Sequence, residues 1–106
     1  MATKTAEAET SLRLDIWLWR ARFFKSRALS ARAIRLKRIR LERNGQTLRV
    51  FKPHTLVRAG DQLVFMRAEH LVHIEVVHMG TRRGPAPEAR TLYCDVQSQT
   101  GESLRA

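Results

Sequence analysis

The chain has 106 residues, a length that suits a single domain and leaves little room for both an enzyme scaffold and a deep substrate pocket. Its 43% of hydrophobic and 28% of charged residues are typical of a globular domain and exclude a disordered chain or a coiled coil. The net charge is +10 and 16 of the 20 basic residues are arginine, whose flat fork of donors matches phosphate oxygens, so the composition favours an anionic polymer as partner.

A first helix is predicted after a polar N-terminal stretch. Residues 1–11 are expected to form a flexible tail, and Ser11 is placed to cap the helix that follows. An apolar face with i, i+3, i+4, i+7 spacing consists of Leu14, Trp17, Leu18 and Ala21. Trp19 lies off this face and shares a side with Asp15 and Arg22.

A second helix is predicted to begin at Ser26, a good N-cap, and to run to about Lys37. Its apolar face is expected to consist of Leu29, Ala33 and Leu36, which leaves Ile34 outside this division. The opposite side and its flank carry the basic residues Arg27, Arg32, Arg35 and Arg38. This helix is therefore expected to pack by one side and to carry positive charge on the other.

The apolar period then changes to two, which predicts a hairpin. Asn44-Gly45 is the strongest short hairpin signal, because a type I′ turn needs positive φ at both positions. With a two-residue turn, the facing pairs are Leu41 with Leu48, Ile39 with Val50, and Arg40 with Arg49.

The rest of the chain is predicted to complete an α+β fold in a single domain. Strands are expected within 57–65 and at 72–76, followed by a loop at 80–87. A short C-terminal helix is expected from Pro87 to about Tyr93.

The candidate binding residues come mainly from the two helices and the hairpin. Between Arg13 and Arg67, basic residues outnumber acidic ones by 15 to 3. The candidates for RNA binding are Arg13, Trp19, Arg22, Lys25, Ser26, Arg27, Arg32, Arg35, Lys37, Arg38, Arg40 and Arg49. Asp15, Asn44 and Gly45 are expected to support them structurally.

The start of the second helix is a candidate phosphate site. Free backbone N–H groups and the positive end of the helix dipole bind anions there, and Lys25 and Arg27 flank this point. An ordinary cap with solvated charges is the alternative. Arg40 opposite Arg49 would repel across the hairpin unless a phosphate lay between them; a tolerated cost or a different register is the alternative.

Trp19 and Asp15 each allow two interpretations. Trp19 either stacks on a base or buttresses an arginine, or it forms a second packing face toward the strands. Asp15 is expected to favour the helix dipole and to orient a nearby arginine rather than to act as a catalytic carboxylate.

No catalytic residue, metal or cofactor is predicted. No second carboxylate lies at useful spacing from Asp15, and no nucleophile motif marks a catalytic triad. The histidines form no i, i+4 pair and Cys94 is the only cysteine, which argues against a zinc site and an intramolecular disulfide. We expect a cytoplasmic protein without membrane contact, because no apolar run approaches the ~20 residues of a span and residues 1–10 lack a signal-peptide core.

Two stretches resemble a known family. RLDIWLWRARFFKSRALSARAI (Arg13 to Ile34) closely resembles the start of the RNA-binding domain named after ribosomal protein S-four, in the form found in the fifteen-kilodalton heat-shock protein family. RGPAPEARTLY (Arg83 to Tyr93) is similar to the second signature of that family. The two matches together cover about residues 12–94. The family usually has a glycine step after the second helix, where this chain has Leu36-Lys37-Arg38.

The resemblance implies an arrangement of parts. An S-four-like RNA-binding domain would span 12–76, with two packed helices, then a small bent antiparallel sheet, and with RNA against the helix pair. Residues 77–94 would pack on it as a family-specific extension, and 95–106 would form a flexible tail. The RNA contacts implied by the resemblance come from Arg13, Arg22, Lys25, Ser26, Arg27 and the basic end of the second helix.

The resemblance also implies a partner, namely ribosomal RNA of the large ribosomal subunit, with peptidyl-tRNA still bound after translation has aborted. We therefore expect a monomeric protein that binds structured RNA and catalyses no reaction. The alternatives are a general chaperone for DNA and RNA, the stand-alone remnant of an RNA-modifying enzyme's binding domain, and an integral ribosomal protein.

Overall fold

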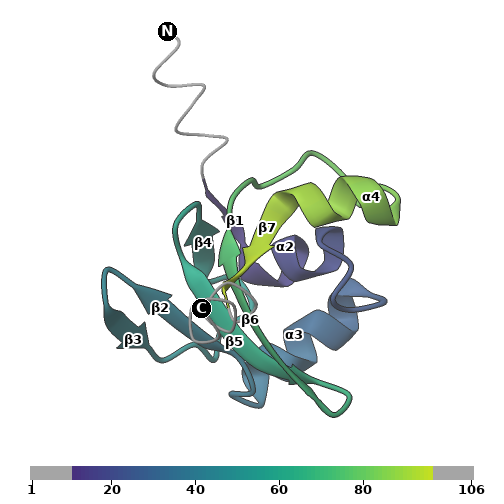
Figure 1. Ribbon diagram of the computed structural model, residues 1–106. Coiled ribbons are helices and arrows are strands. Elements are labelled where there is room, and N and C mark those ends of the chain that lie inside the picture. The colour runs from purple at the N-terminus through teal and green to yellow at the C-terminus, as the bar shows by residue number, and fades with distance from the viewer. Residues whose placement is uncertain (1–10, 97–106) are drawn as a thin grey trace, which may run out of the picture.

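The computed structural model describes residues 11–96, which form three short helices, one 3₁₀ turn and seven strands (Figure 1). The helical elements are α2 (Leu14–Arg20), α3 (Arg27–Arg35), α4 (Ala86–Ala89) and the 3₁₀ turn η1 (Arg90–Leu92). An antiparallel sheet has the strand order β3-β2-β5-β6-β7, with β2 (Arg40–Arg43), β3 (Gln46–Leu48), β5 (Gln62–Arg67), β6 (His70–Val76) and β7 (Tyr93–Asp95). A separate two-stranded sheet pairs β1 (Ser11–Arg13) with β4 (Leu56–Arg58). The predicted α+β class is confirmed, and Figure 1 shows the three helices grouped on one side of the molecule.

Helix α2 begins at Leu14, and a neighbouring segment satisfies its first backbone donors. The Leu14 N–H donates to the Thr55 carbonyl at 2.8 Å, and the Asp15 N–H donates to the Pro53 carbonyl at 3.2 Å. Ser11 belongs to β1, so the prediction that it caps the helix is wrong. The segment before β4 supplies the acceptors that a capping side chain would otherwise provide.

The apolar face predicted for the first helix is confirmed. Its fully buried residues are Leu14, Trp17 and Leu18. The Trp17 indole N–H donates to the His78 carbonyl at 2.8 Å, which joins α2 to the C-terminal segment. Aromatic rings extend this core, since the Phe23 ring centroid lies 4.8 Å from that of Tyr93 and 5.2 Å from that of Phe65.

Helix α3 is capped as predicted but packs by a different face. The Ser26 hydroxyl accepts a hydrogen bond from the Leu29 N–H at 3.1 Å, as an N-cap should. Ala33 is buried as predicted, but Leu29 and Leu36 are 47% and 49% exposed, so the prediction is wrong for two of the three residues of the apolar face. The buried face consists of Ser30, Ala31, Ala33 and Ile34. Ile34, which the predicted division left out, is therefore the large apolar residue by which α3 packs into the core, with small residues around it.

The turn between β2 and β3 has the predicted geometry. Asn44 and Gly45 have φ angles of 54° and 78°, as a type I′ turn requires. Leu41 faces Leu48, so the predicted register of the hairpin is confirmed where the strands pair.

The hairpin ladder is shorter than predicted. Strand β3 ends at Leu48, and two predicted pairs are therefore absent from the ladder: Ile39 with Val50, and Arg40 with Arg49. The chain leaves the sheet here because Val50 turns into the core, where it is only 4% exposed. On its other side, Arg40 pairs with Val64 of β5.

The predicted C-terminal helix is present but ends earlier than expected. Helix α4 and η1 together cover residues 86–92, whereas Tyr93 lies in β7 and faces Val76 of β6. The Tyr93 ring packs edge-on against Trp17, with 6.5 Å between centroids, and this burial favours the extended strand. The predicted tails lie outside the described residues, apart from Ser11 in β1 and residues 95–96.

One partly buried ion pair fastens the hairpin to the turn between β4 and β5. The Arg43 Nε and Nη2 atoms donate to the Asp61 Oδ1 and Oδ2 atoms, each at 2.8 Å. The Arg58 N–H donates to Asp61 Oδ2 at 2.9 Å. The hydrogen bond to Asp61 raises the pKa of Arg43, so the pair keeps its charges and holds the hairpin in place.

A single buried hydroxyl yields a stability prediction. Ser30 is fully buried, and its Oγ has no hydrogen-bond partner within residues 11–96. An unsatisfied buried hydroxyl costs about 1–3 kcal/mol, and alanine is the better helix former. Ser30→Ala should therefore raise the free energy of unfolding by about 1 kcal/mol in a urea titration. Ser26→Ala is the matched control and should lower it by about 1 kcal/mol through loss of the cap. A lower stability for Ser30→Ala would contradict this account.

Candidate nucleic-acid interface

The exposed side of α3 and the turn after it carry a group of cations, which we call the α3 cation face. It consists of Arg27, Arg32, Arg35, Lys37 and Arg38. All five are exposed, and none takes part in the three ion pairs formed within residues 11–96. Like charges this close along a helix destabilise it unless an anion lies among them. The arrangement therefore suits a phosphate backbone.

The predicted cluster at the start of α3 is assembled. The Ser26 hydroxyl is used by the Leu29 N–H, while Lys25 and Arg27 are exposed on either side of the cap. The positive end of the α3 dipole therefore lies between two exposed cations, and this local field favours an anion.

Helices α2 and α3 each end with a cation in left-handed backbone. Arg22 has φ 67° and Lys37 has φ 58°, and each occupies the position after the helix cap at which glycine is common. Schellman motifs close both ends through the N–H of the next residue, Phe23 after α2 and Arg38 after α3, each 3.1 Å from its acceptor carbonyl. A residue with a Cβ costs about 1–2 kcal/mol in this conformation. The chain thus carries backbone strain at two residues that the sequence singled out for RNA binding.

Arg13 is held by Asp15 in a two-point ion pair. The Arg13 Nε and Nη2 atoms lie 3.1 and 2.8 Å from the Asp15 carboxylate oxygens. The Asp15 side chain is buried while that of Arg13 is half exposed, so the carboxylate orients the guanidinium as predicted. The pair has no net charge. Arg13 can therefore offer oriented N–H donors to a ligand but adds little to the positive charge of the surface.

Trp19 is covered by an arginine that the sequence did not indicate. The Arg83 guanidinium carbon lies 5.9 Å from the Trp19 ring centroid, and Arg83 Nε donates to the Trp19 carbonyl at 3.0 Å. Trp19 is half-buried, and Arg22, its expected neighbour, donates to the Gly84 carbonyl instead. The ring therefore packs against the 80–87 loop on one side, and RNA contact by Trp19 stays a prediction.

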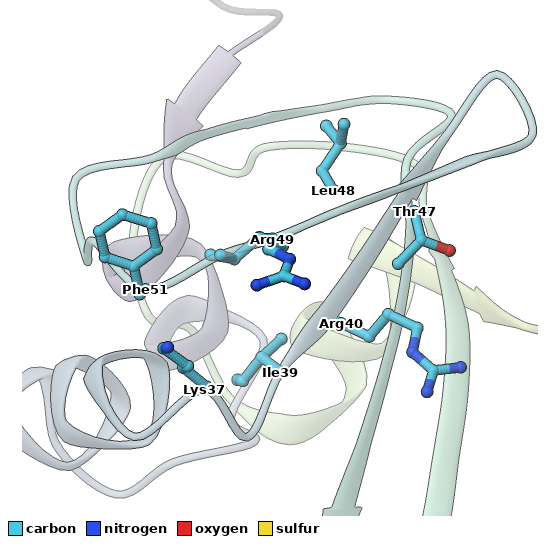
Figure 2. Close-up of a pocket in the computed structure, with 8 residues that line it drawn as sticks. Lys37, Ile39, Arg40, Thr47, Leu48, Arg49 and Phe51 are labelled. Carbon is cyan, nitrogen blue, oxygen red and sulfur yellow. The ribbon is translucent and has the colours of Figure 1, made fainter.

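A pocket of about 280 Å³ opens between the hairpin and the end of α3, and we call it the hairpin pocket. Its lining residues are Lys37, Ile39, Arg40, Thr47, Leu48, Arg49, Val50 and Phe51. Figure 2 shows Phe51 and Lys37 toward one end of the pocket, Arg40 toward the other, and Arg49 between them. Arg40 and Arg49 thus share a pocket although they are not ladder partners.

Phe51 is the residue of this pocket that sequence reasoning missed as a binding residue. Its side chain is 48% exposed, whereas Val50 beside it is buried. The signal in the sequence was an aromatic residue directly before Lys52-Pro53, where the predicted strand had to end. An apolar floor with an exposed ring and a cationic rim can hold an unstacked base and its neighbouring phosphates.

The predicted residues are therefore divided among separate places. Lys37 joins the α3 cation face to the hairpin pocket, because it belongs to both. Arg22 and Lys25 line a different pocket, between the α2–α3 connection and α4. Arg13 is fixed on β1, and Asn44 and Gly45 form the hairpin turn.

Three further properties concern the described residues alone. Within residues 11–96, His, Cys, Asp and Glu side chains form no group of three or more that could hold a metal ion. No helix in this part of the chain has the length and apolar character needed to cross a bilayer. Cys94 is a free thiol.

The curated proteins and the solved structure that are similar to this chain belong to one family. No protein-family model matches the chain. The heat shock protein 15 homologs of Haemophilus influenzae and Aeromonas salmonicida are each 33% identical to it, over 91 and 93 residues, or 86% and 88% of this chain. The matched regions cover 66% and 67% of those relatives, so the chain spans about two thirds of their length. A trimeric structure of heat shock protein 15 from Vibrio cholerae superposes with a TM-score of 0.73 at 33% identity, over 91% of this chain and 93% of that one.

The fold and the site define a small α+β protein whose helix pair and β-hairpin display cations that form no ion pair within residues 11–96. The identity and coverage of its relatives place it more narrowly. The chain belongs to the heat shock protein 15 family, as the resemblance of its two sequence stretches predicted.

The left-handed backbone at Lys37 makes a testable prediction. Lys37→Gly should raise the free energy of unfolding by about 0.5–1 kcal/mol, because glycine adopts this conformation without a Cβ clash. Lys37→Ala removes the same charge but keeps the Cβ, and it should change stability by less than about 0.5 kcal/mol. Urea denaturation of both variants separates the causes: equal stabilisation would show that charge repulsion, and not the backbone, is relieved.

Proposed function

We propose that this protein binds structured RNA, with the α3 cation face on the phosphate backbone and the hairpin pocket on an unpaired base. The observation that carries the proposal is a set of seven cations without a carboxylate partner within residues 11–96: Arg27, Arg32, Arg35, Lys37, Arg38, Arg40 and Arg49. Such a set binds a polyanion through counterion release. The apolar hairpin pocket favours RNA, in which unpaired bases are commonly available for stacking.

The target that we propose is ribosomal RNA on the large ribosomal subunit, including subunits that still carry peptidyl-tRNA. Membership of the heat shock protein 15 family supports this proposal. Crosslinking in cells followed by sequencing of the bound nucleic acid tests it. Enrichment of small-subunit RNA, transfer RNA alone or DNA over large-subunit RNA would overturn the target.

We further propose that the protein acts in the cytoplasm by binding alone, as a monomer. The relatives bear the name of a heat shock protein rather than of an enzyme. The Vibrio cholerae relative is trimeric, so sedimentation of the RNA-free protein is the direct test of the monomer. Uridine isomerisation by the purified chain would contradict the proposed lack of catalysis.

The α3 cation face predicts strong salt dependence. If six to ten phosphates are neutralised, the affinity for a large-subunit RNA fragment should fall ~10³-fold or more between 50 and 200 mM salt. Replacing Arg32 and Arg35 by glutamine should weaken binding about tenfold and reduce the slope of log K against log salt by about two. Fluorescence anisotropy measures both quantities.

The matched control for this double variant is Arg82→Gln. Arg82 is exposed but already paired with Glu88, with 2.6 Å between Nη2 and Oε1, so its replacement should change RNA affinity less than about twofold. A flat salt dependence of the unmodified protein, or equal displacement of the RNA by duplex DNA at the same phosphate concentration, would refute RNA binding of the proposed kind.

The hairpin pocket predicts a contribution that salt does not screen. Phe51→Ala should weaken binding to an RNA hairpin with an unpaired nucleotide by about 1–3 kcal/mol, because a base loses its stacking partner. The salt slope should stay the same, since no cation is removed. Leu56→Ala, which also truncates a half-exposed apolar residue, is the control and should leave affinity unchanged. Equal losses on fully paired and bulged RNA would contradict base stacking in this pocket.

A further inference from the structure

A second pocket, of about 370 Å³, lies where the α2–α3 connection meets the end of β5 and α4. Five of its lining residues are cations: Arg22, Lys25, Arg67, Arg83 and Arg90. Among residues 11–96, no acidic residue lines it. The cations come from four separate segments of the chain, so the pocket exists only in the folded protein. We call it the five-cation pocket.

Two of the five cations are fixed in place without being neutralised. The Arg22 Nε atom donates to the Gly84 carbonyl at 2.6 Å, and the Arg83 Nε atom donates to the Trp19 carbonyl at 3.0 Å. A carbonyl orients a guanidinium but leaves its positive charge available to a ligand. Arg22 is also one of the two cations that follow a helix in left-handed backbone.

The other three cations are free to move toward a ligand. Lys25, Arg67 and Arg90 are exposed and take part in no hydrogen bond or ion pair of their side chains within the described part of the chain. Glu88 of α4 is a nearby carboxylate in sequence, but it is bound to Arg82, whose hydrogen bond lowers the pKa of Glu88. No carboxylate in the described part of the chain neutralises the five cations, so the pocket keeps a concentrated positive field.

The walls of the pocket suggest what kind of anion enters. Phe23 and Tyr93 line it together with Ala21, Ala86 and Ala89, so it has an apolar and aromatic side as well as the cations. A phosphate monoester carries a charge of about −1.5 to −2 at pH 7 and three strong acceptor oxygens, whereas a backbone diester carries only one charge. A concave site with five cations therefore matches a strand end better than a continuous backbone.

We infer that the five-cation pocket binds the terminal phosphate monoester of an RNA strand, with the terminal nucleotide against its apolar side. The inference rests on the proposed RNA binding, and it adds a preference for strand ends to the phosphate contacts of the α3 cation face. It assigns binding roles to Arg67, Arg83 and Arg90, which sequence reasoning left out.

The test compares one RNA hairpin, labelled in its loop, in three forms: with a 5′-phosphate, with a 3′-phosphate, and with hydroxyl groups at both ends. The unmodified protein should bind one phosphorylated form about tenfold more tightly than the hydroxyl form at the same salt concentration. Arg67→Gln combined with Arg90→Gln should abolish this preference while leaving affinity for the hydroxyl form within about twofold, because neither side chain belongs to the α3 cation face or lines the hairpin pocket.

Arg58→Gln is the matched control, since Arg58 is exposed and does not line this pocket, and the end preference should persist. Equal affinity for all three RNA forms would overturn the end-binding inference while leaving the proposed RNA binding intact. If the unmodified protein bound none of the three RNA forms, both the end-binding inference and the proposed RNA binding would be refuted. Adenosine 5′-monophosphate that binds as tightly as the phosphorylated hairpin and displaces it would overturn the assignment to an RNA end in favour of a free nucleotide. Thermal unfolding of the double variant within about 3 °C of the unmodified protein confirms that its fold is kept.

Discussion

The packing of the Trp17 side chain in the core is the interaction on which the rest of this structure depends. Trp17 lies on the buried face of α2, where its ring packs against Phe23 and Tyr93 and its indole N–H donates to the His78 carbonyl. One side chain thereby links α2 to the α2–α3 connection, to β7 and to the C-terminal segment, and loss of such a residue costs about 3–5 kcal/mol. Because α2 cannot shift relative to residues 77–95, the turn after it and the 80–87 loop stay in one fixed relation, and the cations on both are held together.

Within residues 11–96 the protein fixes three arginines, Arg20, Arg22 and Arg83, with backbone carbonyls alone, and it uses carboxylates in three structural pairs. Within residues 11–96, the ion pairs use Asp15, Asp61 and Glu88, one at the start of α2, one behind the hairpin and one on α4. Arg20 and Arg22 donate to the carbonyls of residues 80 and 84 instead. A carbonyl positions a guanidinium without cancelling its charge. Arginines that are fixed in this way are ordered and still contribute to the positive surface. Order and charge together are what recognition of a folded polyanion requires.

The sequence by itself determined the features that follow from local rules. The i, i+3, i+4, i+7 face around Trp17, the Ser26 cap and the Asn44-Gly45 turn are confirmed, because each depends on the rotation per residue or on one short hydrogen bond. The register that places Leu41 opposite Leu48 follows directly from the turn length. The excess of positive charge and the family resemblance were likewise readable from residue order, and the comparisons confirm the family.

Only the tertiary structure decided which surfaces these elements share. Helix α3 buries Ile34 and the small residues around it instead of Leu29 and Leu36, because the position of α3 in the fold, and not the hydrophobicity of its own residues, decides which face is covered. Strand β3 ends early because the Val50 side chain is buried in the core, and Phe51, the next residue, is left exposed beside cations. The five-cation pocket gathers residues from 22 to 90, and no local pattern marks a set that long-range packing brings together. Periodicity describes one element at a time, whereas the site depends on how several elements meet.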